Sequence, residues 1–100
     1  MTAVDLIARI ETTAESFAPV VQLLRAYGDV VRAEPGNLRF ELFAIDDPQR
    51  RLTVVVIERY VDEAAFQAHL RAPENAEVNR ALAAALGGGG SQLDMLVPLD

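Results

Sequence analysis

Residues 34–43 read EPGNLRFELF, and residues 57–70 read IERYVDEAAFQAHL. In the first stretch, Pro35 cannot continue a helix and Gly36 tolerates a positive φ, so a helix is predicted to end there and a strand to follow. In the second stretch, a strand leads into a short helix, and Asp62 is predicted to cap the N-terminus of that helix. The two stretches therefore place a helix–strand junction and a strand–helix junction, from which the other elements can be assigned.

Hydrophobic periodicity predicts the rest of the chain. Apolar and polar residues alternate near the N-terminus, as in a half-buried strand, and then recur at spacings of three and four, as in an amphipathic helix. The predicted elements are a strand at 4–11, a helix from a Ser16 cap to the 34–36 turn, strands at 37–45 and 51–60, a short helix between Asp62 and Pro73, a helix at 74–86, and a strand at 92–99.

This order predicts an α+β, ferredoxin-like split βαβ fold with a four-stranded antiparallel sheet, formed by residues 1–100 as a single domain. The third strand is apolar on both faces, because residues 52–57 read LTVVVI. A strand that is apolar on both faces is buried on both faces. Helices cover one face of the sheet, so a second copy of the chain is predicted to cover the other, giving a homodimer through the sheet face.

Composition excludes several classes of function. The formal net charge is −6 and the pI is about 4.6, so the chain is not expected to bind nucleic acid. It has no cysteine, which excludes thiol catalysis and disulfides. We expect no signal peptide and no membrane span, and therefore a cytoplasmic protein. Every basic residue apart from the histidine is arginine, which together with abundant alanine suggests a bacterial source with GC-rich codons.

His69 is the only histidine, and it shares one face of its predicted helix with Phe66 and Leu70. One interpretation is a core histidine satisfied by a single hydrogen bond. The other is a proton acceptor or donor beside a buried ligand, since imidazole changes charge near neutral pH. A single histidine cannot form a two-histidine metal site, and the acidic residues show no ligand spacing, so no metal is predicted.

Glu58 shares a strand face with Val54, Val56 and Tyr60, which aims a carboxylate into apolar surroundings. Burying that charge is costly unless it is paired, and the predicted partners are His69 or Arg39. A structural ion pair and a functional role are both compatible with this pattern.

Asn37 follows the Pro-Gly turn at the start of a strand. Ordinary turn chemistry is the favoured interpretation, and the alternative is that its amide holds a substrate oxygen or an oxyanion. The aromatic residues are predicted to form core or pocket wall, where a flat ligand can stack against them; they are Tyr27, Phe40, Phe43, Tyr60 and Phe66.

Taken together, the EPG turn before one strand and the E-x-Y…AHL pattern at residues 58–70 after the next resemble the antibiotic biosynthesis monooxygenase family of dimeric α+β barrel proteins. The resemblance covers nearly the whole chain. It implies oxidation of an electron-rich aromatic, a quinol or polycyclic phenol, by O₂ without a metal, flavin or haem cofactor. In that scheme His69 is the base, Glu58 its orienting partner and Asn37 a hydrogen-bond donor to the oxyanion. The substrate-binding residues are Tyr60, Phe66, Phe40, Tyr27 and Arg39.

Other activities of similar proteins fit less well or stay open. The haem-degrading members use a tryptophan, an axial histidine and a first-strand asparagine. This chain has no tryptophan, and it has Asn79 near the position of the axial histidine and Ala8 near that of the asparagine, so haem degradation is disfavoured. An isomerase of a small carbonyl compound, with or without a phosphate group, is one alternative, in which Arg39 or Arg71 holds the phosphate. A binding module without catalysis is the other.

Overall fold

The computed structural model describes residues 2–100, and its elements follow the predicted order. Their bounds are β1 (Val4–Glu11), α1 (Phe17–Arg32), β2 (Asn37–Ala44), β3 (Thr53–Tyr60), α2 (Glu63–Arg71), α3 (Pro73–Leu86) and β4 (Gln92–Leu96). The main difference from the prediction is at the C-terminus, where pairing with β1 stops at Leu96 and the predicted strand to residue 99 is therefore too long.

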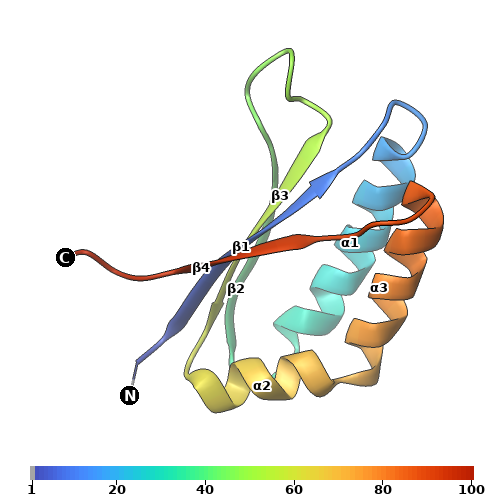
Figure 1. Ribbon diagram of the computed structural model, residues 1–100. Coiled ribbons are helices and arrows are strands. Elements are labelled where there is room, and N and C mark those ends of the chain that lie inside the picture. The colour runs from blue at the N-terminus through green and yellow to red at the C-terminus, as the bar shows by residue number, and fades with distance from the viewer. Residues whose placement is uncertain (1) are drawn as a thin grey trace.

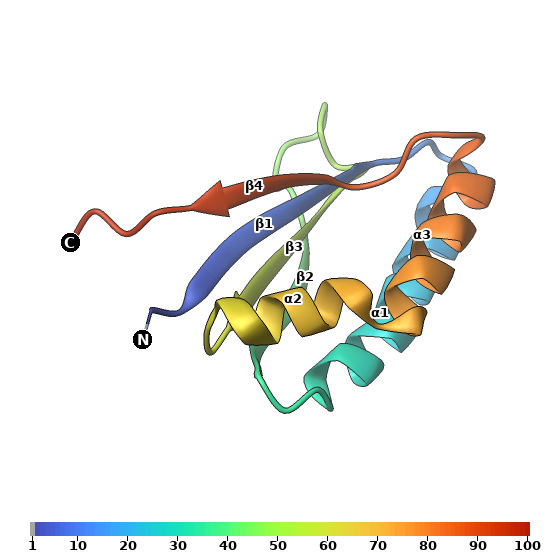
Figure 2. The ribbon, with the colours of Figure 1, turned by 60° about the horizontal axis from the view of Figure 1, so that its bottom comes forward.

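The four strands form one antiparallel sheet in the order β2-β3-β1-β4. In the described residues, the helices all lie on one side of this sheet (Figures 1 and 2). α1 and α3 pack side by side, whereas α2 crosses near the end of β3 and leads directly into α3. The fold is therefore the predicted ferredoxin-like α+β arrangement.

The inner face of the sheet, which we define as the face toward the helices, carries the hydrophobic core. Alternate residues of the two central strands are buried there, because successive side chains of a strand point to opposite faces. The core residues from the strands are Leu6, Ala8, Ile10, Phe40, Val54, Val56 and Tyr60, and the helices contribute Val20, Leu24, Val31, Phe66, Val78 and Leu82.

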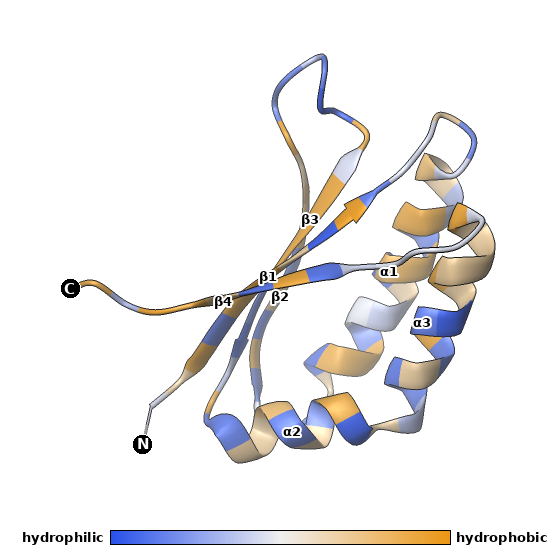
Figure 3. Cartoon of the chain, in the orientation of Figure 1, coloured by the Kyte–Doolittle hydropathy of each residue, from blue (hydrophilic) through white to orange (hydrophobic). Residues whose placement is uncertain are grey.

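The outer face of the sheet carries the intervening residues, among them Ile7, Val55 and Ile57, which are half-buried. Colouring by hydropathy shows hydrophobic residues along both β1 and β3 (Figure 3). Towards the sheet edges, Phe43 is 46% exposed and Leu96 is 43% exposed. The third strand is thus apolar on both faces, as expected, and the homodimer inferred from that pattern stays a prediction.

The Pro-Gly turn before β2 packs against the start of α2. Gly36 is required there, because a Cβ atom at this position would overlap the Cβ of Ala65. The Gly36 carbonyl also accepts a hydrogen bond from the Val61 N–H at 2.8 Å. The predicted cap of α2 is confirmed, since the Asp62 side chain accepts from the Ala65 N–H at 2.8 Å. Turn and helix are therefore held together by packing and by a hydrogen bond.

Proline and glycine mark the two ends of α3, whereas the side-chain cap predicted for α1 is not formed. Pro73 begins α3, and Gly87 ends it with φ at 68°, in the left-handed region. Ser16 occupies the N-cap position of α1 but its side chain does not cap the helix; it accepts a hydrogen bond from the Thr13 N–H instead. Within residues 2–100, every helix is too short or too polar to cross a lipid bilayer.

Candidate functional site

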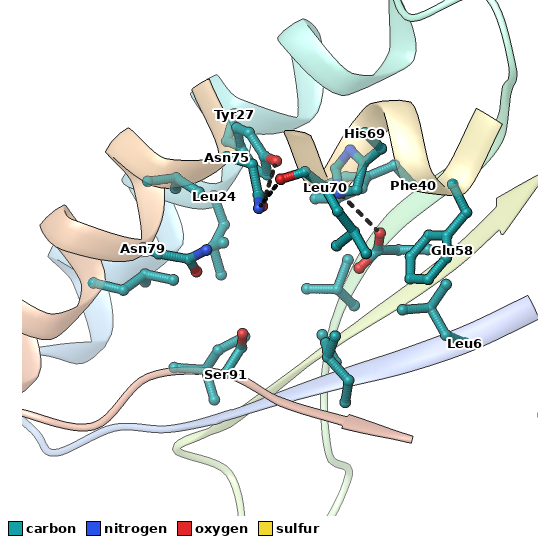
Figure 4. Close-up of a pocket in the computed structure, with 17 residues that line it drawn as sticks. Leu6, Leu24, Tyr27, Phe40, Glu58, His69, Leu70, Asn75, Asn79 and Ser91 are labelled. Carbon is teal, nitrogen blue, oxygen red and sulfur yellow. Dashed lines mark hydrogen bonds and ion pairs between the residues drawn. The ribbon is translucent and has the colours of Figure 1, made fainter. Parts of the chain in front are cut away.

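A cavity of about 90 Å³ lies between the inner face of the sheet and the helices (Figure 4). Aliphatic side chains form most of its wall, and they come from β1, β3, α1, α2, α3 and β4; they are Leu6, Ala8, Ile10, Val56, Leu24, Leu70, Val78, Leu82 and Leu93. A smaller set of polar side chains faces the same space: Tyr27, Glu58, His69, Asn75, Asn79 and Ser91. An apolar cavity with a few convergent polar groups is typical of a small-molecule site.

His69 lies between two carboxylates at one end of this cavity. It points inward from α2 and is only 6% exposed. Its Nδ1 atom lies 3.0 Å and 3.2 Å from the two carboxylate oxygens of Glu34, and its Nε2 atom lies 3.9 Å from Oε1 of Glu58. In residues 2–100, no group of three His, Cys, Asp or Glu side chains is arranged to hold a metal ion. An imidazole placed between two carboxyl groups is suited to proton transfer.

Glu58 is a buried carboxyl group on β3, 6% exposed. Desolvation by burial raises its pKa above the usual glutamate value, and the hydrogen bond from Tyr60 and the nearby His69 oppose that rise. The Tyr60 hydroxyl donates to Oε1 of Glu58 at 2.7 Å, and burial together with this carboxyl group raises the tyrosine pKa as well. Glu58 can therefore carry a proton at a higher pH than an exposed glutamate does.

Tyr27 and Asn75 form a second polar contact on the cavity wall. The Tyr27 hydroxyl donates to Oδ1 of Asn75 at 3.1 Å, and Nδ2 of Asn75 donates to the Leu70 carbonyl at 3.2 Å. Burial and the neighbouring Glu34 raise the pKa of Tyr27, so its phenol stays neutral. These bonds join α1, the end of α2 and the start of α3 around the cavity.

Of the five aromatic residues predicted to form core or pocket wall, Phe43 is misplaced, because it lies 46% exposed on the outer face of the sheet, and the other four lie on the inner side. Tyr27, Phe40 and Phe66 line the cavity. The Phe66 ring stacks on the imidazole with centroids 6.4 Å apart, and the Tyr60 ring lies closer, at 4.9 Å. Tyr60 is fully buried and is not one of the lining residues, so it supports Glu58 and His69 and offers no surface to a ligand.

Besides Tyr60, two predicted site residues do not line the cavity. The Asn37 amide donates to the Arg39 carbonyl at 3.1 Å, which is the turn chemistry considered for it. Arg39 is half-exposed on the outer face, where it pairs with Glu41. The expectation that Arg39 faces Glu58 is wrong because a bulge between residues 37 and 39 shifts the register by one. Phe40 lies opposite Glu58 instead.

Glu34 and two asparagines are site residues that the sequence did not reveal. The sequence pattern indicates only a helix-ending turn at Glu34, whose carboxylate contacts His69 across 35 residues of sequence. Asn75 and Asn79 lie on the inner face of α3, where both border the cavity. Their spacing with Val78 and Leu82, at positions i, i+3, i+4 and i+7 of one helix face, is the sequence signal from which they could have been found.

The chain is similar in sequence and structure to known proteins of one family. The model of the family described as antibiotic biosynthesis monooxygenase matches residues 4–81. No curated protein shows significant sequence similarity to the chain.

Solved structures give the same fold over almost the whole chain. Rv0793 from Mycobacterium tuberculosis is 27% identical with a TM-score of 0.84, covering 99% of this chain and 97% of its own. PA3566 from Pseudomonas aeruginosa is 27% identical with a TM-score of 0.82, covering 100% and 97%. A Bacteroides thetaiotaomicron protein, provisionally assigned as an antibiotic biosynthesis monooxygenase, is 25% identical with a TM-score of 0.79, covering 99% and 91%. With the match over residues 4–81, the chain belongs to the antibiotic biosynthesis monooxygenase family.

Proposed function

We propose that this protein is a monooxygenase that oxidises an electron-rich aromatic, a quinol or a polycyclic phenol, with O₂ and without a metal, flavin or haem cofactor. For a quinol, the balanced reaction is quinol plus O₂ giving hydroxyquinone plus water. One oxygen atom enters the ring and the other leaves as water with two hydrogens from the quinol. All electrons that reduce O₂ come from the substrate, so the protein needs to supply only binding, proton transfer and a dry site.

The observation that carries this proposal is His69, buried at an apolar cavity with its Nε2 atom on the side of Glu58. We propose that Nε2 takes the proton of a substrate hydroxyl. The resulting anion gives up an electron to O₂ more readily than the neutral phenol does. The positive charge that develops on the imidazole is stabilised by the Glu34 and Glu58 carboxyl groups on either side.

The cavity walls support the rest of this chemistry. Tyr27, Phe40 and Phe66 offer aromatic surface to a flat substrate, and aliphatic side chains form an apolar wall around the reacting pair. The geometry gives no support to the oxyanion role predicted for Asn37, whose amide is engaged with the Arg39 carbonyl. The polar groups that do face the cavity on α3 are Asn75 and Asn79.

We also propose that the protein acts as a homodimer through the outer face of the sheet. The half-buried Ile7, Val55 and Ile57 at the centre of this face support the proposal, because apolar sheet faces are normally covered. The cytoplasmic location inferred from the sequence remains a prediction.

The test is oxygen uptake by purified, chelator-treated protein with a panel of quinols and polycyclic phenols. We expect uptake above the uncatalysed rate that is unaffected by chelator and falls roughly 10²-fold or more in His69→Ala, as for loss of a general base. Gln67→Ala, an exposed change on the same helix, is the matched control and should leave the rate unchanged. No uptake with any compound would count against the monooxygenase.

A second candidate function is a proton-shuttling isomerase of a small carbonyl compound. The raised pKa of Glu58 favours it, since a protonated carboxyl group close to a histidine base can donate one proton while the base takes another. Turnover without O₂ distinguishes this function: an isomerase works under anaerobic conditions, and the monooxygenase does not. Arg39, on the outer face, is not placed to hold a phosphate in the cavity.

A further inference from the structure

We infer that Glu34 is the positioning residue of this site, and that its carboxylate holds His69 in the tautomer with the hydrogen on Nδ1, leaving Nε2 free to accept a proton in the cavity. The inference deepens the proposed function and rests on it for its catalytic meaning. Nothing in the local sequence around His69 indicates such a partner, because Glu34 lies in the turn between α1 and β2.

The contact geometry assigns the hydrogen to Nδ1. Both Glu34 oxygens lie within hydrogen-bond distance of Nδ1, at 3.0 Å and 3.2 Å. An ionised carboxylate only accepts hydrogen bonds, so the imidazole nitrogen facing it must donate. Glu58, at 3.9 Å from Nε2, is too far for a hydrogen bond and cannot set the tautomer (Figure 4). The orienting role predicted for Glu58 therefore belongs to Glu34.

The turn that carries Glu34 is fixed at both ends. The Glu34 N–H donates to the Val31 carbonyl at 2.9 Å, and the Glu34 carbonyl accepts from the Asn37 N–H at 3.1 Å. Gly36, two residues on, is packed against Ala65 and hydrogen-bonded to Val61 at the start of α2. Since His69 lies on that same helix, the packing of Gly36 sets the position of Glu34 relative to the imidazole.

The Glu34–His69 pair is largely buried, so its contact affects the stability of a protonated imidazole. The His69 side chain is 6% exposed and that of Glu34 is 21% exposed. A buried imidazole that takes up a proton needs a nearby negative charge, because an unpaired charge in apolar surroundings is costly. Glu34 thus supplies both the fixed ring orientation before proton transfer and a counter-charge after it.

The test uses the fact that His69 is the only histidine, so ¹⁵N-histidine labelling gives NMR signals from this ring alone. In the wild type, with the imidazole neutral, we expect the Nδ1–H tautomer to dominate. In Glu34→Ala this preference should be lost, and in Glu34→Gln, which retains an acceptor oxygen, it should be retained. Glu77→Ala, an exposed change on α3, is the matched control and should behave as the wild type.

A second variant keeps the carboxylate but moves it. In Gly36→Ala the added methyl group meets Ala65, so the turn must shift and the tautomer preference should again be lost. This variant decides the question if Glu34→Ala does not fold. A dominant Nδ1–H tautomer in folded Glu34→Ala, or in Gly36→Ala where Glu34→Ala does not fold, would overturn the inference, and so would an Nε2–H tautomer in the wild type.

Activity separates this inference from the proposed function. We expect kcat for oxygen uptake to fall by up to roughly 10²-fold in Glu34→Ala, with a smaller change in KM, because proton transfer to a wrongly oriented His69 is slowed and the cavity wall is unchanged. A wild type that consumes no oxygen but shows the expected tautomers would refute the proposed monooxygenase and leave the role of Glu34 standing.

Discussion

The inner and outer faces of the central strands are built from the same eight-residue segments but differ in what they do. On the inner face, Ile10 is 1% exposed and packs with the helices, and Glu58 and His69 are buried beside a cavity. On the outer face, Ile7, Val55 and Ile57 are half-buried between ion pairs. Alternation along a strand thus separates a core that holds the candidate site from a surface suited to the proposed partner.

The charged groups on the two faces differ in the same way. The outer pairs Arg9–Asp94 at 3.2 Å and Arg59–Asp5 at 3.4 Å are partly exposed to solvent and contribute little to stability. The inner carboxyl group of Glu58 is shielded from water, so its environment shifts its pKa. Burial, and not the number of charges, therefore decides which face can carry out proton transfer.

The largest expected effect is a loss of folding stability caused by a substitution on the inner face. Ile10→Ala removes a fully buried side chain and leaves a void, so we expect it to lower the free energy of unfolding by about 2–5 kcal/mol. Val30→Ala, at a position 42% exposed on α1, is the control and should cost far less. Denaturant unfolding measures both, and equal losses would contradict the assignment of the core.

On the outer face, the expected effect is on association. Ile57→Arg places a charge at the centre of the proposed dimer interface, and we expect it to convert the dimer to a folded monomer, because an unpaired buried charge is costly. Sedimentation equilibrium of wild type and variant measures the change, and Val30→Arg serves as the control. A wild-type protein that is monomeric at all concentrations would refute the proposed dimer.

The smallest expected effect is the pH dependence contributed by Glu58. Its pKa in the folded protein is raised, so its stabilising contribution is present below about pH 4.3, the ordinary value in an unfolded chain, and is lost as pH rises through the folded pKa. We therefore expect Glu58→Gln to become more stable relative to the wild type as pH rises through that window.

Denaturant unfolding of both proteins between about pH 4 and pH 8 measures this difference, with the exposed Glu77→Gln as control. A stability difference between Glu58→Gln and wild type that does not change with pH would show that Glu58 has the same pKa folded and unfolded. The amide carbonyl introduced by Glu58→Gln can still accept from the Tyr60 hydroxyl, so the variant tests the charge and leaves the hydrogen bond in place.

Much of the fold could be predicted because its signals are local. The period of two in β1 and β3, the Pro-Gly turn at residues 35–36 and the Asp62 cap each depend on neighbouring residues. The site was only partly predictable. His69, Glu58, Tyr27, Phe40 and Phe66 do line one cavity, but the β-bulge near Leu38 turned Arg39 away, and no sequence pattern signalled that bulge.

By itself, the sequence determined the order of the elements, the two apolar faces of β3 and the presence of one imidazole and one inward carboxyl group on adjacent elements. Only the tertiary structure decided which carboxylate holds His69, because Glu34 reaches it from a turn 35 residues away. It also decided that Tyr60 lies behind the site and that Asn75 and Asn79 border it. The physical reason is that secondary structure follows from local backbone and periodicity preferences, whereas a site is made by side chains that only packing brings together.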